Sequence, residues 1–155
     1  MSTEKATEYL EARGFGDRII THAQSTATVE LAAQALGVEG ARIAKSLTFM
    51  TDAPIMVVTA GDMKIDNAKY KAEFGTKAKM LSPAEVDELI GHSVGGVCPF
   101  GIKSGVRVYL DVSMKRFDTI YPACGGSNNA VRLTPDELES LSGAEKWVDV
   151  CKSMV

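Results

Sequence analysis

Long apolar runs in the first half of the chain predict the strands of a central sheet. The segment Ala41–Met50 is mostly apolar and Ile55–Thr59 is continuously apolar, with the turn Thr51–Pro54 between them. A continuous apolar run is typical of a strand that is buried on both faces, and a short turn favours antiparallel pairing. We therefore predict a hairpin from these two segments. Further on, the alternation of apolar and polar residues over Val106–Asp111 predicts a strand with one solvent-facing side.

Capping and stop signals mark the helices. Ser82 and Thr134 are each followed by proline and, three residues after the cap, by glutamate, which is the capping-box signature of a helix start. Thr26 or Thr28 can cap the helix that ends before Gly37, where glycine favours a left-handed terminator. The predicted helices are Ser2–Arg13, Val29–Leu36, Asn67–Phe74, Ser82–Ile90 and Thr134–Leu141.

The remaining apolar segments predict short strands at Arg18–His22, Lys77–Leu81 and Lys146–Cys151. Thr119–Pro122 and Ala130–Leu133 flank a turn rich in glycine and asparagine, and this pattern predicts a second hairpin. Locally paired strands that are interrupted by helices indicate the α+β class rather than a doubly wound parallel sheet. A chain of 155 residues fits one domain, so we expect a single domain over residues 1–155.

Composition narrows the classes of protein. The 45% apolar and 24% charged content is typical of a globular chain, and the net charge of −3 argues against a protein coated by nucleic acid. No apolar run approaches the roughly 20 residues that cross a bilayer, and the N-terminus lacks a signal-peptide pattern, so we predict a cytoplasmic protein without membrane association. Five lysines gather locally, either as a solvated face or as a landing patch for phosphates. They are Lys64, Lys69, Lys71, Lys77 and Lys79.

The cysteines and histidines do not indicate a metal or redox centre. Cys98, Cys124 and Cys151 are too far apart for a Cys-x-x-Cys pair, and an odd, widely spaced set in a cytosolic chain indicates free thiols. His22 and His92 are the two histidines, and no zinc-ligand spacing links them to the cysteines. We therefore predict neither a metal nor a cofactor.

Two features stand out from this ordinary background. The segment Gly95–Gly101 places three glycines and a proline in seven residues, which suits backbone that approaches a ligand closely or aims its amides in a special direction. The plainer interpretation is a tight turn between core segments. Lys45 stands within an apolar strand, so its ammonium either faces solvent or points into a polar cleft.

These residues resemble the YbaK family of aminoacyl-tRNA deacylases, which is similar to the editing domain inserted in bacterial prolyl-tRNA synthetases. The resemblance is carried by Lys45, by the pattern Gly-x-x-x-Pro-x-Gly over Gly95–Gly101, and by a second glycine segment at Ala123–Ser127. It extends from about Thr21 to the end of the chain. It implies a mixed, strongly curved, barrel-like sheet with surrounding helices, and a single mouth at which Lys45 and both glycine segments converge.

The resemblance also implies an activity, namely trans-editing hydrolysis of the aminoacyl ester of a mischarged tRNA. The expected substrate is tRNA for proline that carries cysteine, alanine or another small amino acid, bound through its 3′ acceptor end, with prolyl-tRNA synthetase as the implied partner. Lys45, Gly96 and Gly101 would stabilise the substrate and the developing oxyanion. Substrate contacts are implied for His22, Thr26, Cys98, Pro99, Phe100, Gly125 and Ser127.

No side chain is marked by sequence as a general base, and the resemblance implies that water is oriented by the backbone and by the ribose hydroxyl of the substrate. Two other interpretations stay open. The chain could be a binding module without turnover that acts on a synthetase or a nucleotide. It could also be a thiol hydrolase that uses Cys98, although the sequence shows no activating histidine. The residues Ser127–Ala130 leave the preferred amino acid open.

Overall fold

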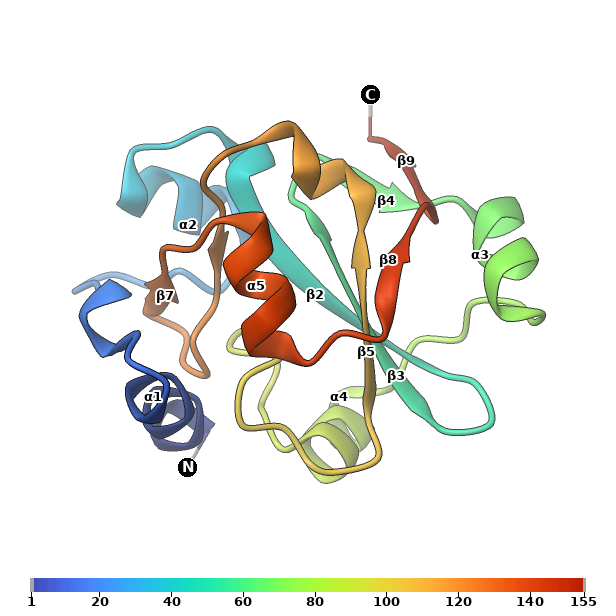
Figure 1. Cartoon of the computed structure of the whole chain (residues 1–155), viewed down its shortest axis with the longest axis horizontal. Helices are drawn as coiled ribbons and strands as arrows, with labels where there is room; N and C mark the ends of the chain where they lie inside the picture. Colours follow the sequence, from blue (N-terminus) through green and yellow to red (C-terminus); the bar gives the residue numbers. More distant parts are fainter. Residues whose placement is uncertain (1, 155) are drawn as a thin grey trace.

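The computed structural model describes residues 2–154, and it arranges helices around a five-stranded mixed sheet (Figure 1). Within that range the helices are α1 (Ser2–Ala12), α2 (Val29–Leu36), α3 (Asn67–Phe74), α4 (Pro83–Glu85) and α5 (Pro135–Ser142). The strands are β1 (Ile19–Thr21), β2 (Ile43–Met50), β3 (Pro54–Ala60), β4 (Met63–Ile65), β5 (Arg107–Asp111), β6 (Tyr121–Pro122), β7 (Asn129–Val131), β8 (Lys146–Val148) and β9 (Cys151–Ser153). The predicted α+β class is confirmed.

The central sheet has the strand order β6-β2-β3-β5-β8. β2 and β3 form the predicted antiparallel hairpin, in which Lys45 lies opposite Thr59. The other three pairings of this sheet, β2 with β6, β3 with β5 and β5 with β8, are parallel. Two small antiparallel sheets, β1 with β7 and β4 with β9, flank it.

The barrel-like closure of the sheet is not confirmed. Among the described residues, β6 and β8 are the edges of an open sheet and do not pair with each other. These edge strands are only two and three residues long, so they offer few backbone groups with which to close a barrel. The second predicted hairpin retains its pairing at Ile120 and Leu133, which exchange hydrogen bonds of 2.8 and 3.0 Å, but its two arms join different sheets.

Two apolar layers cover the faces of the sheet. β3 is buried on both sides, as its continuous apolar run predicts. Met56 and Val58 belong to the larger layer. The helices α1 and α5 and the helical turn Val86–Ile90 contribute to this layer through Ala6, Leu10, Val86, Ile90, Leu138 and Leu141. Val57 belongs to the smaller layer on the opposite face, together with Tyr70 of α3. Alternate residues of one strand therefore serve two cores.

The helix boundaries follow the capping signals. Ser82 and Thr134 both form complete capping boxes, and α2 begins at the side chain of Thr28 and ends at Gly37, which has a left-handed backbone with φ of 70°. The helix predicted over Ser82–Ile90 changes after one turn into a π-helical turn at Val86–Ile90 (η3). None of the helices within residues 2–154 is long and apolar enough to cross a membrane.

The strand predicted at Lys77–Leu81 is shorter than expected. Met80 forms an isolated bridge with Phe49, and the segment otherwise touches the edge of β2 through two backbone hydrogen bonds, from Met50 N to Lys79 O at 2.8 Å and from Leu81 N to Thr48 O at 3.1 Å. The segment must turn at once into α4 at Pro83, which leaves no length for a regular strand. These bonds nevertheless hold the start of α4 beside β2.

Candidate active site

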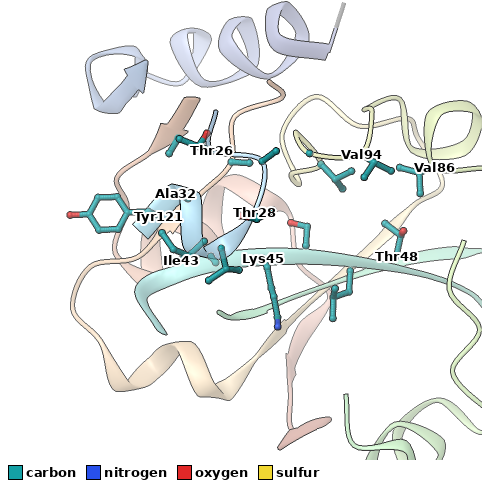
Figure 2. A pocket seen from close by; sticks show the side chains of 18 of the residues that line it. Thr26, Thr28, Ala32, Ile43, Lys45, Thr48, Val86, Val94 and Tyr121 are labelled. Carbon is teal, nitrogen blue, oxygen red and sulfur yellow. The ribbon is translucent and has the colours of Figure 1, made fainter. Parts of the chain in front are cut away.

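A cavity of about 390 Å³ lies between β2, the start of α2, the start of α4 and the Gly95–Gly101 loop (Figure 2). Its rim includes Met80 and Val94, whose side chains are 62% and 65% exposed, so the mouth is apolar. A volume of a few hundred Å³ is typical of sites for small molecules or for the end of a larger ligand. The lining is mostly apolar and carries a few hydroxyl groups at Thr26, Thr28, Ser46, Thr48 and Tyr121.

The floor of the cavity is made by small side chains of β2. Ala44, Ser46 and Thr48 alternate along the strand and all line the cavity, because side chains at every second position of a strand share a face. Large side chains at these positions would fill the space. This alternation of small residues was a signal that sequence analysis missed, since Ala41–Met50 was considered only as an apolar run around Lys45.

The start of α2 forms one wall. Thr28 caps the helix by accepting from the backbone of Leu31 at 3.2 Å, and Thr28, Val29 and Ala32 line the cavity. Just before it, the backbone N–H of Thr26 donates to the Ser127 carbonyl at 2.6 Å. The free amides of a helix N-terminus carry a partial positive charge, so this wall favours an oxygen atom or a negative charge.

The two glycine segments lie in direct contact with each other. A Cβ atom added at Gly96 would lie 2.5 Å from the Gly125 carbonyl oxygen and 2.8 Å from the Gly126 nitrogen. A Cβ atom at Gly95 would lie 3.3 Å from the Ala27 side chain and 3.9 Å from that of Ser127. The Gly95–Gly101 loop therefore packs against both the second glycine segment and the stretch before α2, and only glycine fits at Gly96 without displacing backbone.

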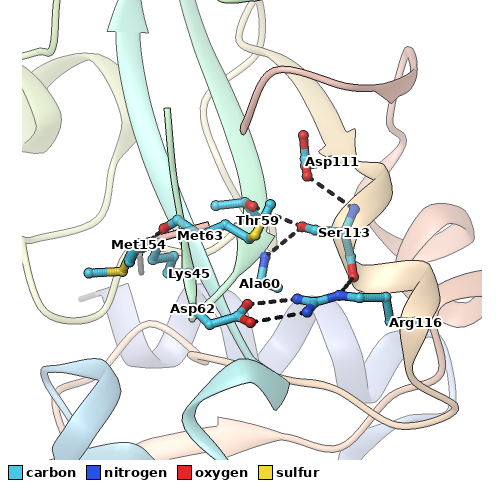
Figure 3. A network of polar contacts seen from close by, with 9 residues as sticks. All are labelled: Lys45, Thr59, Ala60, Asp62, Met63, Asp111, Ser113, Arg116 and Met154. Carbon is cyan, nitrogen blue, oxygen red and sulfur yellow. Dashed lines mark hydrogen bonds and ion pairs between the residues drawn. The ribbon is translucent and has the colours of Figure 1, made fainter. Parts of the chain in front are cut away.

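Lys45 borders the cavity, but its ammonium points away from it. Figure 2 shows the side chain running from β2 away from Thr26 and Thr28. The ammonium donates to the carbonyl of Met63 and lies 3.8 Å from the sulfur of Met154 (Figure 3). Burial lowers the pKa of Lys45, because desolvation disfavours the charged form. The expected convergence of this charge with the Gly95–Gly101 loop is therefore absent from this conformation, and its role in a reaction stays a prediction.

The second half of the Gly95–Gly101 loop lies in the core rather than at the cavity. Cys98 and Phe100 are 0% exposed, and neither lines the cavity. Gly101 packs against the backbone of Lys5 in α1, where an added Cβ atom would lie 2.7 Å from the carbonyl oxygen. Pro99 is also buried and does not line the cavity. Substrate contacts at Cys98, Pro99 and Phe100 and a catalytic role for Gly101 stay predictions that this geometry does not favour.

His92 lies beside Cys98, and sequence analysis did not predict this contact. His92 is fully buried, its Nε2–H donates to the Phe100 carbonyl at 2.7 Å, and Cys98 Sγ lies 3.5 Å from the same nitrogen. Burial lowers the pKa of His92 and raises that of Cys98 far above the ordinary value. A neutral, enclosed thiol is a poor nucleophile, so the pair does not resemble a catalytic thiol site.

His22 and the second glycine segment complete the set of predicted site residues. The His22 N–H donates to the Asn128 carbonyl at 2.8 Å, and the Asn128 side chain returns a 3.1 Å hydrogen bond to the His22 carbonyl. His22 does not line the cavity. Gly125 and Ser127 also lie behind the wall that Thr26 and Gly95 form, where they position that wall.

The cavity contains no evident acid or base. Within residues 2–154, the side chains that line it include no aspartate, glutamate or histidine, and the same residues hold no group of three or more metal-ligating side chains. The backbone amides of Gly95 and Val97 donate no hydrogen bond to any atom of these residues, whereas the amide of Gly96 donates to the Ser93 carbonyl at 3.0 Å. Free amides at the cavity can bind an oxygen atom of a ligand.

A small cavity with mostly apolar walls and a few hydroxyl groups is typical of a site for a compact ligand. The chain belongs to the aminoacyl-tRNA editing domain family, whose model matches residues 23–141. This match confirms the resemblance to the YbaK family. It covers the cavity walls from α2 to the second glycine segment and extends into α5.

Individual relatives agree with this family. The chain is 57% identical over 130 residues to the uncharacterized protein YwhH of Bacillus subtilis, with 83% of each chain covered. It is 32% identical over 136 residues to the proline–tRNA ligase of Thermosipho melanesiensis, which covers 86% of this chain and 24% of the ligase. It is 27% identical over 121 residues to EbsC of Enterococcus faecalis, a candidate Cys-tRNA(Pro)/Cys-tRNA(Cys) deacylase, with 76% and 74% covered.

A solved structure shares the fold over almost the whole chain. The crystal structure of a candidate trans-editing enzyme for prolyl-tRNA synthetase is similar to this protein with a TM-score of 0.88 and 32% sequence identity, and the match covers 98% of both chains. The two proteins therefore share this fold.

Proposed function

We propose that this protein is a trans-editing hydrolase that cleaves the aminoacyl ester of mischarged tRNA for proline carrying cysteine, alanine or another small amino acid. The observation that carries the proposal is the cavity of about 390 Å³ where β2, the start of α2 and the Gly95–Gly101 loop meet. Its small floor residues leave room for an aminoacyl group, and its open mouth admits the 3′ end of a longer nucleic acid. The names of the proline–tRNA ligase and EbsC relatives support this substrate.

Backbone amides are the proposed oxyanion donors. Ester hydrolysis develops negative charge on the carbonyl oxygen, and fixed donors at that place lower the barrier. Gly95 and Val97 have amides that are unbonded within residues 2–154, and both residues line the cavity. We assign the oxyanion to these two amides rather than to Gly96, whose amide is used by Ser93. The N-terminus of α2 on the facing wall adds a further partial positive charge.

The water that attacks the ester is proposed to be oriented by the substrate itself. No carboxylate or imidazole among residues 2–154 lines the cavity, and the ammonium of Lys45 is bound to the Met63 carbonyl, so no side chain of these residues is positioned in the cavity as a general base. A ribose hydroxyl next to the ester can instead hold a water molecule. The same observation favours the alternative, a binding module without turnover, and the experiment below separates the two.

Cations near the mouth are proposed to hold the nucleotide end of the substrate. Lys77 and Lys79 line a surface groove with Met50, directly before the rim residue Met80. Lys69, from the same lysine-rich stretch, instead forms an ion pair in which its ammonium lies 3.1 Å from a carboxylate oxygen of Asp149. Lys45 would contact the substrate only if its flexible side chain broke its hydrogen bond to the Met63 carbonyl and bound a phosphate or ester oxygen instead.

The test measures release of free amino acid from a panel of tRNAs for proline that carry alanine, cysteine, serine, threonine or proline. We expect release from at least one mischarged tRNA and none from prolyl-tRNA. Ala27→Trp, at an exposed position on the cavity rim, should abolish release because the indole occupies the cavity. The matched control is Ala72→Trp on the exposed surface of α3, which should leave the rate unchanged.

Two further variants separate the alternatives. Lys45→Ala with an unchanged fold should lower the rate if the ammonium reaches the substrate, and Cys98→Ala should leave it unchanged if the buried thiol takes no part. Tight binding of every mischarged tRNA without release of amino acid would establish the binding module instead. Release that persists in Ala27→Trp would show that the reaction does not occur in this cavity.

A further inference from the structure

The outer edge of β2 has a gap in its pairing, and the gap lies at the cavity. Successive residues of a strand direct their backbone N–H and C=O groups alternately to the two sides. The C=O of Thr48 accepts from the N–H of Leu81, and the N–H of Met50 donates to the C=O of Lys79. Thr48 and Met50 therefore direct these groups to the outer edge of β2, away from β3. Toward the other end of β2, pairing with β6 ends at Ala44, which lies opposite Pro122. Ser46 has the same orientation as Ala44 and Thr48, so its backbone N–H and C=O face the unpaired gap.

Two hydroxyl groups beside this gap lack hydrogen-bond partners. The Oγ atoms of Ser46 and Thr26 are both buried and have no partner among the described residues, although both residues line the cavity. Thr26 is only 7% exposed, and its backbone is held by the bond to Ser127. A buried polar atom without a partner is unfavourable, so two such atoms on residues that line one cavity point to a ligand that satisfies them.

The available groups match one part of an aminoacyl ester. An aminoacyl ester carries an amino group and a carbonyl on adjacent atoms, so it offers several donors next to one acceptor. The C=O of Ser46 and the two hydroxyl groups can accept from the amino group, and the N–H of Ser46 can donate to the carbonyl. No carboxylate among residues 2–154 lines the cavity, so neutral acceptors must perform this recognition.

We propose that Ser46 and Thr26 form a subsite for the free α-amino group of the substrate. This inference rests on the proposed function and adds to it a substrate class: aminoacyl-tRNA with an unblocked amino group, as opposed to tRNA carrying an N-acylated amino acid or a peptide. An N-acyl group removes the charge and most of the donors of the amino group. The hydroxyls then have no donor to accept from.

The first test compares substrates for the unmodified protein. Alanyl-, cysteinyl- and seryl-tRNA for proline are prepared with free and with N-acetylated amino groups, and kcat/KM for ester cleavage is measured. We expect N-acetylation to lower kcat/KM by about 100-fold, because each lost hydrogen bond to a charged group is worth about tenfold or more. Lactyl-tRNA, in which a hydroxyl replaces the amino group without added bulk, should also be cleaved at least about tenfold more slowly than alanyl-tRNA.

The second test removes the acceptors. Ser46→Ala and Thr26→Val should each lower kcat/KM for the free aminoacyl-tRNA by about tenfold and leave the slow N-acetylated substrate unchanged, so that discrimination between the two falls. Thr26→Ser, which keeps a hydroxyl, should restore discrimination if Thr26→Val is impaired. Ser104→Ala removes an exposed hydroxyl outside the cavity and should behave like the unmodified protein.

The outcomes distinguish this inference from the proposed function. Equal cleavage of free and N-acetylated substrates, or of alanyl- and lactyl-tRNA, would overturn the amino-group subsite while leaving the hydrolase intact. An unchanged ratio in both Ser46→Ala and Thr26→Val would also overturn it. Failure to cleave any free aminoacyl-tRNA in the panel would instead contradict the proposed function.

Discussion

At the scale of single residues, the glycine at position 96 positions the site, because it has no side chain to hold two backbone segments apart. Gly96 lies against the backbone of Gly125 and Gly126, and this contact sets the Gly95–Gly101 loop beside the stretch before α2. Gly95 and Val97 line the cavity because the loop is held there. Backbone cannot move aside as a flexible side chain can, so the contact tolerates no added atom.

Gly96→Ala should lower both stability and activity. The added Cβ atom would lie 2.5 Å from the Gly125 carbonyl oxygen, and overpacking of this kind costs about 1–3 kcal/mol of unfolding free energy. Denaturant unfolding measures the loss, and deacylation assays should show a lower kcat because the donor amides are displaced. The matched control is Gly40→Ala, whose Cβ atom would meet only the Val29 side chain at 3.5 Å. Equal stability of the two variants would contradict the close packing described here.

At the scale of elements, the start of α2 links helix formation to the cavity. Thr28 is both the N-cap of α2 and part of the cavity wall. α5 begins with a similar cap at Thr134, which does not line the cavity. The two caps therefore differ in their relation to the site but share the same local chemistry, in which a side-chain oxygen accepts from a backbone amide of the first turn.

Thr28→Ala and Thr134→Ala should be separable by activity but not by stability. Loss of either cap should lower the unfolding free energy by about 1 kcal/mol. Only Thr28→Ala should raise KM for the aminoacyl-tRNA, because it loosens the amides at the cavity wall. Thermal unfolding and steady-state deacylation measure the two effects. A KM increase of the same size in Thr134→Ala would show that α2 has no special relation to the substrate.

At the scale of the whole molecule, an ion pair joins distant parts of the chain. Arg18, at the entry to β1, makes hydrogen bonds of 3.0 and 3.2 Å to the two carboxylate oxygens of Glu137 in α5. Arg18 also lies next to β7 in space, because its carbonyl accepts from the Arg132 amide at 3.1 Å. The hydrogen bonds from Arg18, together with the capping bonds of Thr134, lower the pKa of Glu137 below its ordinary value of 4.5.

This pair should make stability depend on pH in the acid range. A carboxylate whose pKa is lowered by folding binds protons more readily when unfolded, so its stabilisation is full above the ordinary pKa and is lost as pH falls through the lowered one. The difference in unfolding free energy between the unmodified protein and Arg18→Met should be constant at neutral pH and shrink below pH 4.5. Arg13→Met is the control, because Arg13 donates to the Tyr9 carbonyl and has no carboxylate ion pair among the described residues, so its effect should not change with pH. A difference for Arg18→Met that stays constant to low pH would contradict the assignment.

Much of the fold was predictable because its signals are local. Capping boxes at Ser82 and Thr134 and the apolar run of β3 depend on neighbouring residues, and each forms as predicted. Of the two candidate caps of α2, Thr26 and Thr28, Thr28 is the one that forms. The expected barrel was not confirmed, because edge pairing depends on the lengths and positions of strands that are distant in sequence. The predicted strand at Lys77–Leu81 was too long, because the segment turns at once into α4 at Pro83.

The site was predictable only in part. The sequence by itself determined that a glycine-rich loop, an isolated lysine and a second glycine segment belong to one editing family, since these motifs are patterns of residue type. Only the tertiary structure decided which of them face the cavity, because a one-residue step along a strand reverses the direction of a side chain. Ser46 consequently forms part of the cavity floor, whereas the side chain of the neighbouring Lys45 extends to Met63 on the opposite side of β2.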